Sequence, residues 1–212
     1  AASLGISNLL CLSGDHQTFG DHPQAKNVFD VDSIQLVKIA TEMRDAAKFS
    51  GGKDVDGPPE MFIGAAVNPF ADPFKIQVPR LAKKVAAGAQ FIQTQCVFNL
   101  EKFEEFMKGV RDRGLHEKTY ILAGITPLKS ATMAEYIATK VAGMDVPEAV
   151  INRLKGVEKK KQKQEGIKIA VETIQQLKKI KGVKGVHIMA IEWEDAVPEI
   201  VQQAGLLPKN GR

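Results

Sequence analysis

The chain has 212 residues, of which 44% are hydrophobic and 25% charged, and its formal net charge is +4. This apolar content excludes an intrinsically disordered chain, and no apolar run approaches the ~20 residues of a membrane-spanning helix. The two cysteines lack Cys-x-x-Cys spacing and favour a reducing compartment, so we expect a cytoplasmic protein without membrane partners.

Five short apolar runs bounded by Gly, Pro or Asn predict buried β-strands. In chain order they cover 8–12, 61–67, 91–96, 120–125 and 186–191. Helical periodicity fills the intervals, and Asp32-Ser33, Asn99 and Ser130 or Thr132 are the predicted caps of three of the helices. The other helices are expected at 74–87, from Pro147, at 159–180 and at 194–204.

Strand and helix alternate five times, which predicts an α/β fold with a parallel sheet. A doubly wound sheet and a (β/α)₈ barrel both satisfy this pattern. The turn after the first run, Leu12-Ser13-Gly14-Asp15, is no G-x-G-x-x-G, so the barrel is favoured. Because the chain opens on Ala1 without Met, we expect about three further βα units before it. Residues 1–212 are then a single domain, the last five units of a barrel.

The basic excess is concentrated at 155–163 and 178–184, without interleaved aromatic or Gly-rich motifs. This pattern favours a solvated helix face over a nucleic-acid site, and a docking surface for an acidic partner is the alternative. We therefore expect no nucleic-acid partner.

Active-site groups of such barrels lie at the carboxyl ends of the strands. Asp15 follows the first strand, either as a turn former or as a ligand-binding group. His16 and His22 beside Asp15 and Asp21 lack a recognised metal-ligand spacing, which favours hydrogen bonding within the loop, and no metal site is predicted.

The third strand carries Gln93 and Gln95 on one side, and at least one of these amides is expected to face a ligand. Cys96, on the opposite side, is interpreted as a small core residue, and Lys83 and Lys84 as solvated residues on a helix face. The residues thus predict a pocket lined by Asp15, Asn68 and Gln95 that suits an uncharged heteroaromatic ligand.

The chain also resembles the methylenetetrahydrofolate reductase family, in forms from anaerobic and acetogenic bacteria, over residues 2–208. The motifs that carry the resemblance are Ser13-Gly14-Asp15, the loop 20–30, Ala66-Val67-Asn68-Pro69, the Lys84-Val85-x-Ala87-Gly88-Ala89 segment, Gln93-Thr94-Gln95, Ala123-Gly124-Ile125, Glu165-Gly166-Ile167 and Gly185-Val186-His187.

The resemblance implies a barrel that binds FAD and uses NADH or NADPH to reduce 5,10-methylenetetrahydrofolate. It implies that Asp15 is catalytic and that Gln95 binds the folate substrate. The cofactor-binding residues that it implies are Ser13, Gly14, Asp15, Phe29, Asp30, Asn68, Ala71 and Lys84. Lys84 thereby changes from a solvated lysine to a phosphate partner.

The family's general acid belongs to the units expected before Ala1, so we expect little activity and weak FAD binding from this chain alone. A homo-oligomer or an iron–sulfur partner subunit is also implied. Two other functions stay open: a non-catalytic flavin- or folate-binding subunit of an electron-transfer complex, and a corrinoid- or pterin-dependent methyltransferase barrel.

Overall fold

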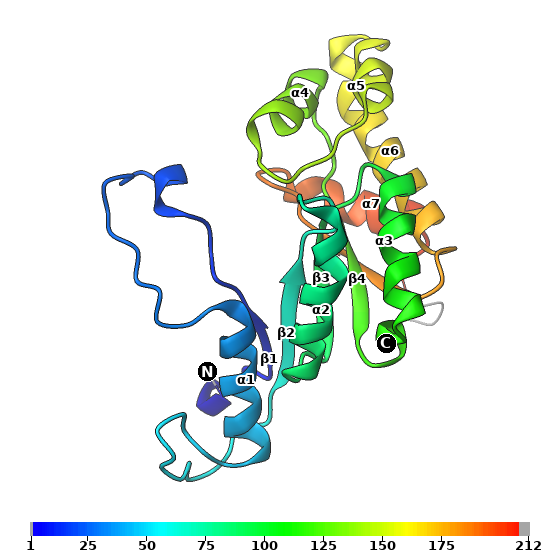
Figure 1. Cartoon of the computed structure of the whole chain (residues 1–212). Helices are drawn as coiled ribbons and strands as arrows, with labels where there is room; N and C mark the ends of the chain where they lie inside the picture. The colour runs from blue at the N-terminus through cyan, green and yellow to red at the C-terminus, as the bar shows by residue number, and fades with distance from the viewer. Residues whose placement is uncertain (1, 208–212) are drawn as a thin grey trace. The chain divides into compact units, whose positions relative to one another are not determined.

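The computed structural model describes residues 2–207. Its strands are β1 (Asn8–Cys11), β2 (Phe62–Val67), β3 (Phe91–Cys96), β4 (Tyr120–Ile125) and β5 (Val183–Ile188). They follow one another in the sheet in the order β1-β2-β3-β4-β5, and the β1–β2 and β4–β5 pairs are parallel (Figure 1). The predicted α/β class is confirmed, in an arrangement consistent with part of a (β/α)₈ barrel.

The α-helices fill the intervals between the strands. They are α1 (Ser33–Asp45), α2 (Gln77–Ala86), α3 (Leu100–Asp112), α4 (Ala131–Lys140), α5 (Glu148–Lys155), α6 (Gln162–Leu177) and α7 (Val197–Gln203). Short 3₁₀ turns occur at Ala2–Leu4, Gln17–Phe19, Phe74–Ile76, Leu115–Glu117, Lys159–Lys161 and Glu194–Ala196. None of the helices among residues 2–207 combines the length and apolar character that crossing a membrane requires.

The caps predicted from the sequence are confirmed. The Asp32 carboxylate accepts hydrogen bonds from the backbone N–H groups of Ile34 and Gln35, and the Gln35 amide oxygen accepts one from the Asp32 N–H. This reciprocal pair is a capping box, which satisfies N–H groups that a helix start otherwise leaves unpaired. Asn99 caps α3 and Ser130 caps α4 through a single side-chain oxygen, which accepts from Lys102 N and Met133 N respectively.

The prediction of the fifth strand is wrong by three residues at each end. The strand runs from Val183 to Ile188, whereas the apolar run covers 186–191. After the strand, Met189 N still bonds to Ile125 O, but Trp193 N bonds back to Ala190 O and Glu192 has a φ of 51°. The end of the apolar run therefore lies in a turn rather than in the sheet.

Contacts between Cα atoms divide the chain into two compact units. The described part of unit 1 comprises residues 2–66 and Pro79–Ile92, and that of unit 2 comprises Val67–Val78 and 93–207. Unit 1 holds β1, α1 and nearly all of β2 and α2, and unit 2 holds most of β3 and all elements from α3 onward.

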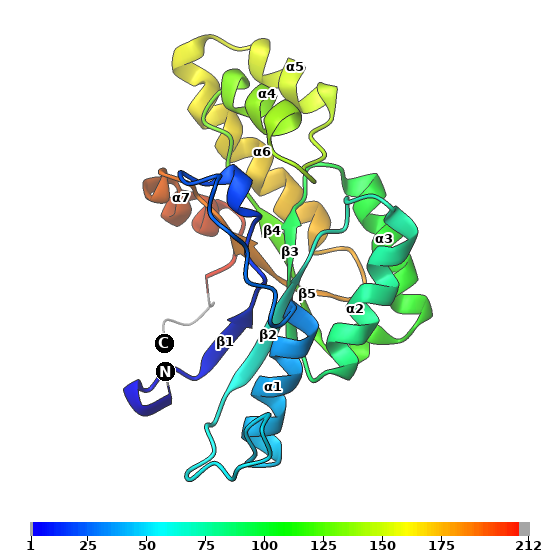
Figure 2. The same ribbon diagram turned by 60° about the vertical axis from the view of Figure 1, so that its left-hand side comes forward.

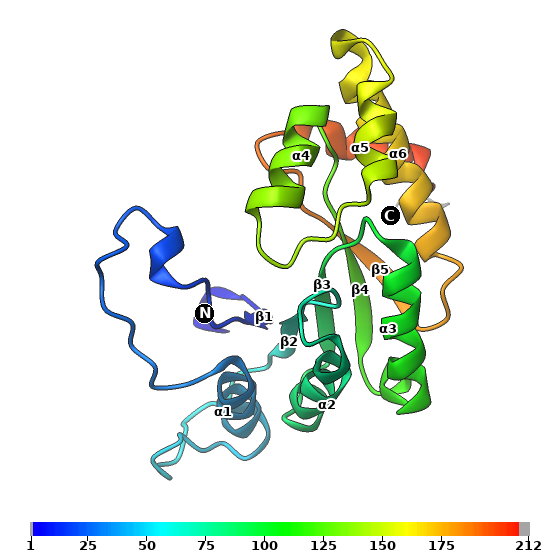
Figure 3. The same ribbon diagram turned by 45° about the horizontal axis from the view of Figure 1, so that its top comes forward.

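Within unit 1, a long loop joins β1 to α1 and extends away from both, as the dark blue segment of Figure 3 shows. A group of hydrogen bonds joins the end of α1 to the neighbouring segments of this unit. Arg44, on α1, donates hydrogen bonds to the Gln90 side chain and to Met61 O. The Gln90 amide oxygen also accepts from Ile63 N at 3.0 Å. These bonds join α1, the start of β2 and the segment before β3.

Within unit 2, α4, α5 and α6 gather into a cluster next to one another (Figure 2). Their buried core consists of Leu128, Ala131, Ala134, Ile137, Leu154 and Ile169. Helix α3 contributes Phe103 and Phe106, which are fully buried, with ring centroids 6.3 Å apart. These apolar contacts hold the connections that follow β3 and β4.

Candidate functional site

The loop after β1 and the start of α1 line an open cavity of about 430 Å³. It is lined by Ser13, Gly14, Asp15, His16, Asn27, Val28, Phe29, Val31, Asp32 and Gln35. Four of the residues predicted for the site, Ser13, Gly14, Asp15 and Phe29, thus lie around one cavity. Asp30 is exposed and lies outside its lining.

The base of this cavity is held by Ser13. Its Oγ accepts a hydrogen bond from Ser33 N at 3.0 Å, which ties the carboxyl end of β1 to the amino end of α1. Gly14 follows with a φ of 71°, a left-handed conformation that favours glycine, and a Cβ there would meet nothing within 4 Å. The tied strand end and the turn at Gly14 present Asp15 to the cavity.

His16 organises the loop through both ring nitrogens. Its Nε2 lies 2.9 Å from Asn27 Nδ2, and its Nδ1 lies 2.9 Å from Thr18 Oγ1. The predicted loop hydrogen bonding of His16 is confirmed. Among residues 2–207, no group of three or more His, Cys, Asp or Glu side chains has an arrangement that could hold a metal ion.

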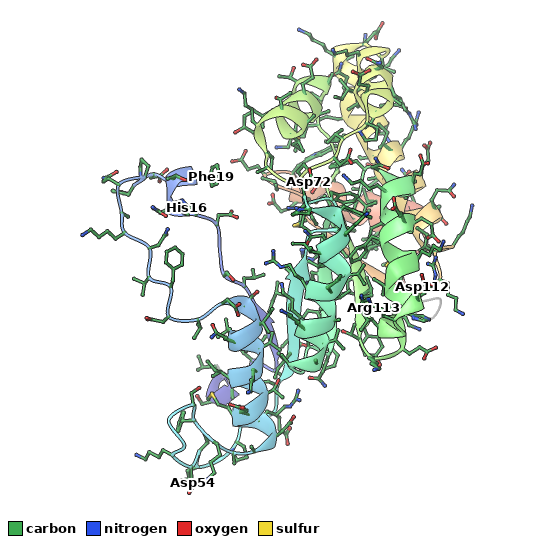
Figure 4. All side chains as sticks on the ribbon, viewed as in Figure 1. His16, Phe19, Asp54, Asp72, Asp112 and Arg113 are labelled. Atoms are coloured by element: carbon green, nitrogen blue, oxygen red, sulfur yellow. The ribbon has the colours of Figure 1, made fainter. Side chains whose placement is uncertain are left out.

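The same loop exposes a set of large apolar side chains. Phe29 is 82% exposed, and Phe19, Val28 and Val31 are exposed as well. His16 and Phe19 mark this loop in Figure 4. Apolar surface beside polar groups is typical of a site that receives a partly apolar ligand.

The solvated position expected for Lys84 is wrong. Lys84 is only 8% exposed, and its Nζ donates a 2.6 Å hydrogen bond to Ala66 O near the carboxyl end of β2. Burial lowers its pKa, nearby Arg80 lowers it further, and Asp32 opposes both effects. The ammonium group is therefore held against the end of a strand and its charge is poorly hydrated.

In unit 2, Asn68 and Ala71 lie on the connection that follows β2. The Asn68 side chain accepts from Phe70 N and donates to Gly143 O, both at 2.9 Å. The Ala71 carbonyl accepts from Gln77 Nε2 at 3.1 Å. Both polar groups of the Asn68 amide thus stabilise the chain itself, a structural role that sequence reasoning missed because Gly143 is 75 residues away.

Successive residues at the end of β3 point to opposite faces of the sheet and differ in burial. Gln93 and Gln95 are half-buried, whereas Thr94 and Cys96 are buried on the other side. Gln95 Oε1 accepts from Cys96 N at 3.0 Å, and its amide nitrogen makes no hydrogen bond within residues 2–207. Gln95 therefore retains a donor for a ligand, as its predicted role requires.

Sequence reasoning also missed the contributions of Asn27, Asp32 and Gln35 to the cavity. The signal for two of them was present, because Asp followed three residues later by Gln at a helix start is typical of a capping box. Asn27 carried no such signal, since its partner His16 lies 11 residues earlier in an irregular loop.

The interpretation of Cys96 as a core residue is confirmed. The thiol is fully buried, and its Sγ lies 2.7 Å from Thr126 Oγ1. Burial raises the pKa of Cys96 to about 11 and also raises the pKa of Cys11.

We expect neither thiol to react with 5,5′-dithiobis(2-nitrobenzoate) at pH 8 within minutes. A shift of two pKa units lowers the thiolate fraction of Cys96 about 100-fold, and burial blocks access as well. Absorbance of the released thionitrobenzoate measures the reaction, with denatured protein as the control in which both thiols react. Rapid modification of the folded protein would contradict the buried placement.

Comparisons with known proteins place these features in context. The family model described as methylenetetrahydrofolate reductase matches residues 1–205. Methylenetetrahydrofolate reductase 2 of Schizosaccharomyces pombe is 32% identical over 219 residues, which cover 99% of this chain and 33% of that protein. Methylenetetrahydrofolate reductase 1 of the same yeast is 27% identical over 216 residues, with coverages of 99% and 33%.

A probable methylenetetrahydrofolate reductase (NADPH) of Caenorhabditis elegans is 26% identical over 155 residues, which cover 70% of this chain and 23% of that protein. The chain thus spans a third or less of the length of these curated relatives.

A solved structure has a related fold. It is an uncharacterized protein from Clostridium thermocellum that binds two copies of 5-methyl-5,6,7,8-tetrahydrofolic acid. The TM-score is 0.51 at 15% sequence identity, and the match covers 78% of this chain and 67% of that one. This likeness concerns the fold alone.

Proposed function

We propose a function from one premise: this chain belongs to the methylenetetrahydrofolate reductase family. Its βα units supply part of a barrel that binds FAD and reduces 5,10-methylenetetrahydrofolate to 5-methyltetrahydrofolate, with NADH or NADPH as the electron donor. The observation that carries the proposal is the cavity at the carboxyl end of β1, around which Ser13, Gly14, Asp15 and Phe29 gather. Carboxyl ends of strands are where enzymes of this fold place their chemistry.

The lining of the cavity fits a flavin. A flavin ring is planar and largely apolar with a polar edge, and the exposed ring of Phe29 offers an aromatic surface beside the polar groups of Ser13 and Asp15. Gly14 leaves open space where any other residue would place a Cβ. When bound, FAD supplies the hydride chemistry.

Asp15 has the charge that the folate step requires. Opening of the five-membered ring of the folate generates a cationic iminium group. A carboxylate on a fixed turn stabilises that positive charge without having to reorganise during the reaction. The bond from Ser33 N to Ser13 Oγ keeps this turn in place, and we assign Asp15 the role of an electrostatic group.

Gln95 and Lys84 complete the proposed assignment. The amide nitrogen of Gln95 is the donor that we assign to the folate pterin. Lys84 already donates to Ala66 O, so a phosphate contact requires it to exchange or share that bond. A folate substrate is also supported by the Clostridium thermocellum neighbour, which binds 5-methyltetrahydrofolic acid.

The test is a titration of FAD into the 212-residue chain, followed by the quenching of flavin fluorescence. We expect weak binding and little turnover. Phe29→Ala should weaken FAD at least fivefold, because aromatic stacking on a base-like ring is worth about 1–3 kcal/mol.

The matched control for this titration is Phe49→Ala. Phe49 is another exposed phenylalanine of unit 1, and it does not line the cavity. Its substitution should leave FAD affinity unchanged. Equal effects of the two substitutions would reject the cavity as the flavin site, and tight stoichiometric FAD with turnover would reject the expectation of weak binding.

A further inference from the structure

A second cavity lies at the other end of the strands in unit 2. The residues that lead into β4 and β5 enclose about 570 Å³, between 116–120 on one side and Lys181, Gly182 and Lys184 on the other. Both strands begin here, whereas the chemistry of this fold is at the carboxyl ends. Asp112 and Arg113, labelled in Figure 4, mark the end of α3 just before this segment.

The charge of this cavity is strongly positive. Lys118, Lys181 and Lys184 line it, and none of their ammonium groups makes an ion pair or hydrogen bond with any residue in 2–207. Glu117 is the single acidic residue of the lining, and its carboxylate lies 3.8 Å from His116 Nε2.

The basic run at 155–163 is different. Lys155 pairs with Glu135, and both Lys160 and Lys161 pair with Glu158. These pairs fit the predicted solvated helix face. The three lysines of the cavity form no such ion pairs within residues 2–207, so their charge is available to a ligand.

The wall of the cavity also contains polar atoms without partners. Thr119 is only 4% exposed, and within residues 2–207 neither its Oγ1 nor His116 Nδ1 makes a hydrogen bond. Leaving a buried polar group unpaired is unfavourable, and such groups are rare in folded proteins. Both atoms are shielded from solvent and lie beneath the cavity surface, so the exposed lysine ammonium groups are the groups that a ligand can reach.

The geometry of this wall is fixed by Gly182. Its φ is 102°, and a Cβ at this position would lie 2.9 Å from His116 Cβ and 3.1 Å from Met107 Cε. The backbone between Lys181 and Lys184 is therefore held directly against the segment that carries His116. Lys181 and Lys184 therefore extend from a tightly packed backbone segment.

We propose that this cavity binds a small phosphate-bearing metabolite. Lysine ammonium groups recognise phosphate as point charges and donate charge-assisted hydrogen bonds to its oxygens. The volume exceeds what a single inorganic phosphate fills, which favours a diphosphate or a phosphate ester. The two cavities share no lining residue, so this proposal does not depend on the flavin assignment.

Isothermal titration calorimetry with pyrophosphate, at constant ionic strength, tests the proposal. We expect saturable binding in the submillimolar range. Lys118→Ala and Lys184→Ala should each weaken it at least threefold, and their combination at least tenfold. The matched control is the double variant Lys159→Ala/Lys163→Ala, which removes the same charge from the exposed run outside the cavity and should bind pyrophosphate like the wild type.

Two results would overturn the proposal. Equal weakening by the control pair would mean that overall charge attracts the anion, and equal affinity for citrate would mean that the cavity does not select phosphate. Inorganic phosphate and ribose 5-phosphate are titrated in the same way. If ribose 5-phosphate binds more tightly than inorganic phosphate, the cavity also accommodates the sugar of a phosphate ester. Equal affinity for ribose 5-phosphate and inorganic phosphate would contradict a phosphate ester as the ligand.

Thr119→Val provides an independent readout. Replacing the buried hydroxyl with a methyl group should raise the unfolding midpoint of the ligand-free protein by about 2–4 °C and leave pyrophosphate affinity unchanged, because the lysines carry the binding. A lower midpoint in the absence of ligand would show that the hydroxyl already has a partner, and a threefold loss of pyrophosphate affinity would contradict binding through the lysines alone.

Discussion

Replacing Gly166 with alanine should destabilise the fold by more than ~3 kcal/mol. A Cβ on Gly166 would lie 1.8 Å from the carbonyl oxygen of Leu128 and 2.8 Å from its carbonyl carbon. These are backbone atoms in the connection between β4 and α4, so no side-chain rotation can relieve the clash. The whole of α6 would have to move away from the core that it shares with α4 and α5.

Urea denaturation followed by circular dichroism measures this loss. The matched control is Gly156→Ala, at the end of α5, where the backbone has a right-handed helical conformation and the nearest atom to an added Cβ is Asn152 O at 3.4 Å. We expect this control to change the free energy of unfolding by less than about 1 kcal/mol. Equal midpoints for Gly166→Ala and the wild type would show that α6 is not packed against Leu128 as described.

A second large effect is expected in unit 1, where Phe91 covers Gly64. A Cβ on Gly64 would lie 2.2 Å from Phe91 Cζ, and the Phe91 ring also stacks on Phe62 at a centroid distance of 5.4 Å. Gly64→Ala should therefore cost about 2–4 kcal/mol through overpacking, and Phe91→Ala about 3–5 kcal/mol through the cavity that it leaves. In the double variant the new methyl group fills space that the ring has vacated.

The two substitutions should consequently be non-additive. We expect the double variant to be at least ~1 kcal/mol more stable than the sum of the single losses predicts. Gly51→Ala is the control, because a Cβ there would meet no atom within 4 Å and its φ lies outside the left-handed region. Strict additivity would mean that the Phe91 ring does not occupy the space above Gly64.

The sequence was sufficient to predict the elements whose signals are local. Short apolar runs and flanking turn residues located β2, β3 and β4, and the caps at Asp32, Asn99 and Ser130 required only neighbouring residues. The fifth strand was placed wrongly because Lys184 and Gly185 interrupt its apolar run, although Val183 and Gly185 pair with Ile121 and Leu122 of β4 and Lys184 lies at the irregularity between them. The pairing with β4, rather than local hydrophobicity, determines where β5 begins.

The candidate site residues also differ in how much of their role the sequence indicated. The position of Asp15 directly after a strand indicated it as a site residue, whereas Ser13, Gly14 and Phe29 were assigned through the family resemblance and lie around the same cavity. Lys84 was placed in solvent, although it lies three residues after the fully buried Leu81 and therefore on the same helix face. The Gly143 partner of Asn68 is distant in sequence, and the lysines around the second cavity come from two separate segments of the chain, so no local pattern indicates either feature.

The hydrogen bond between Ser13 and Ser33 has a consequence for how this surface can vary. It joins residues 20 apart and fastens the base of the loop to the sheet and to α1. Lengthening a loop whose ends are already fixed costs little, about 0.6 kcal/mol for each doubling. The segment between the two serines can therefore be replaced without disturbing its anchor points. Its length and tip can be redesigned for another ligand while β1 and α1 keep their positions.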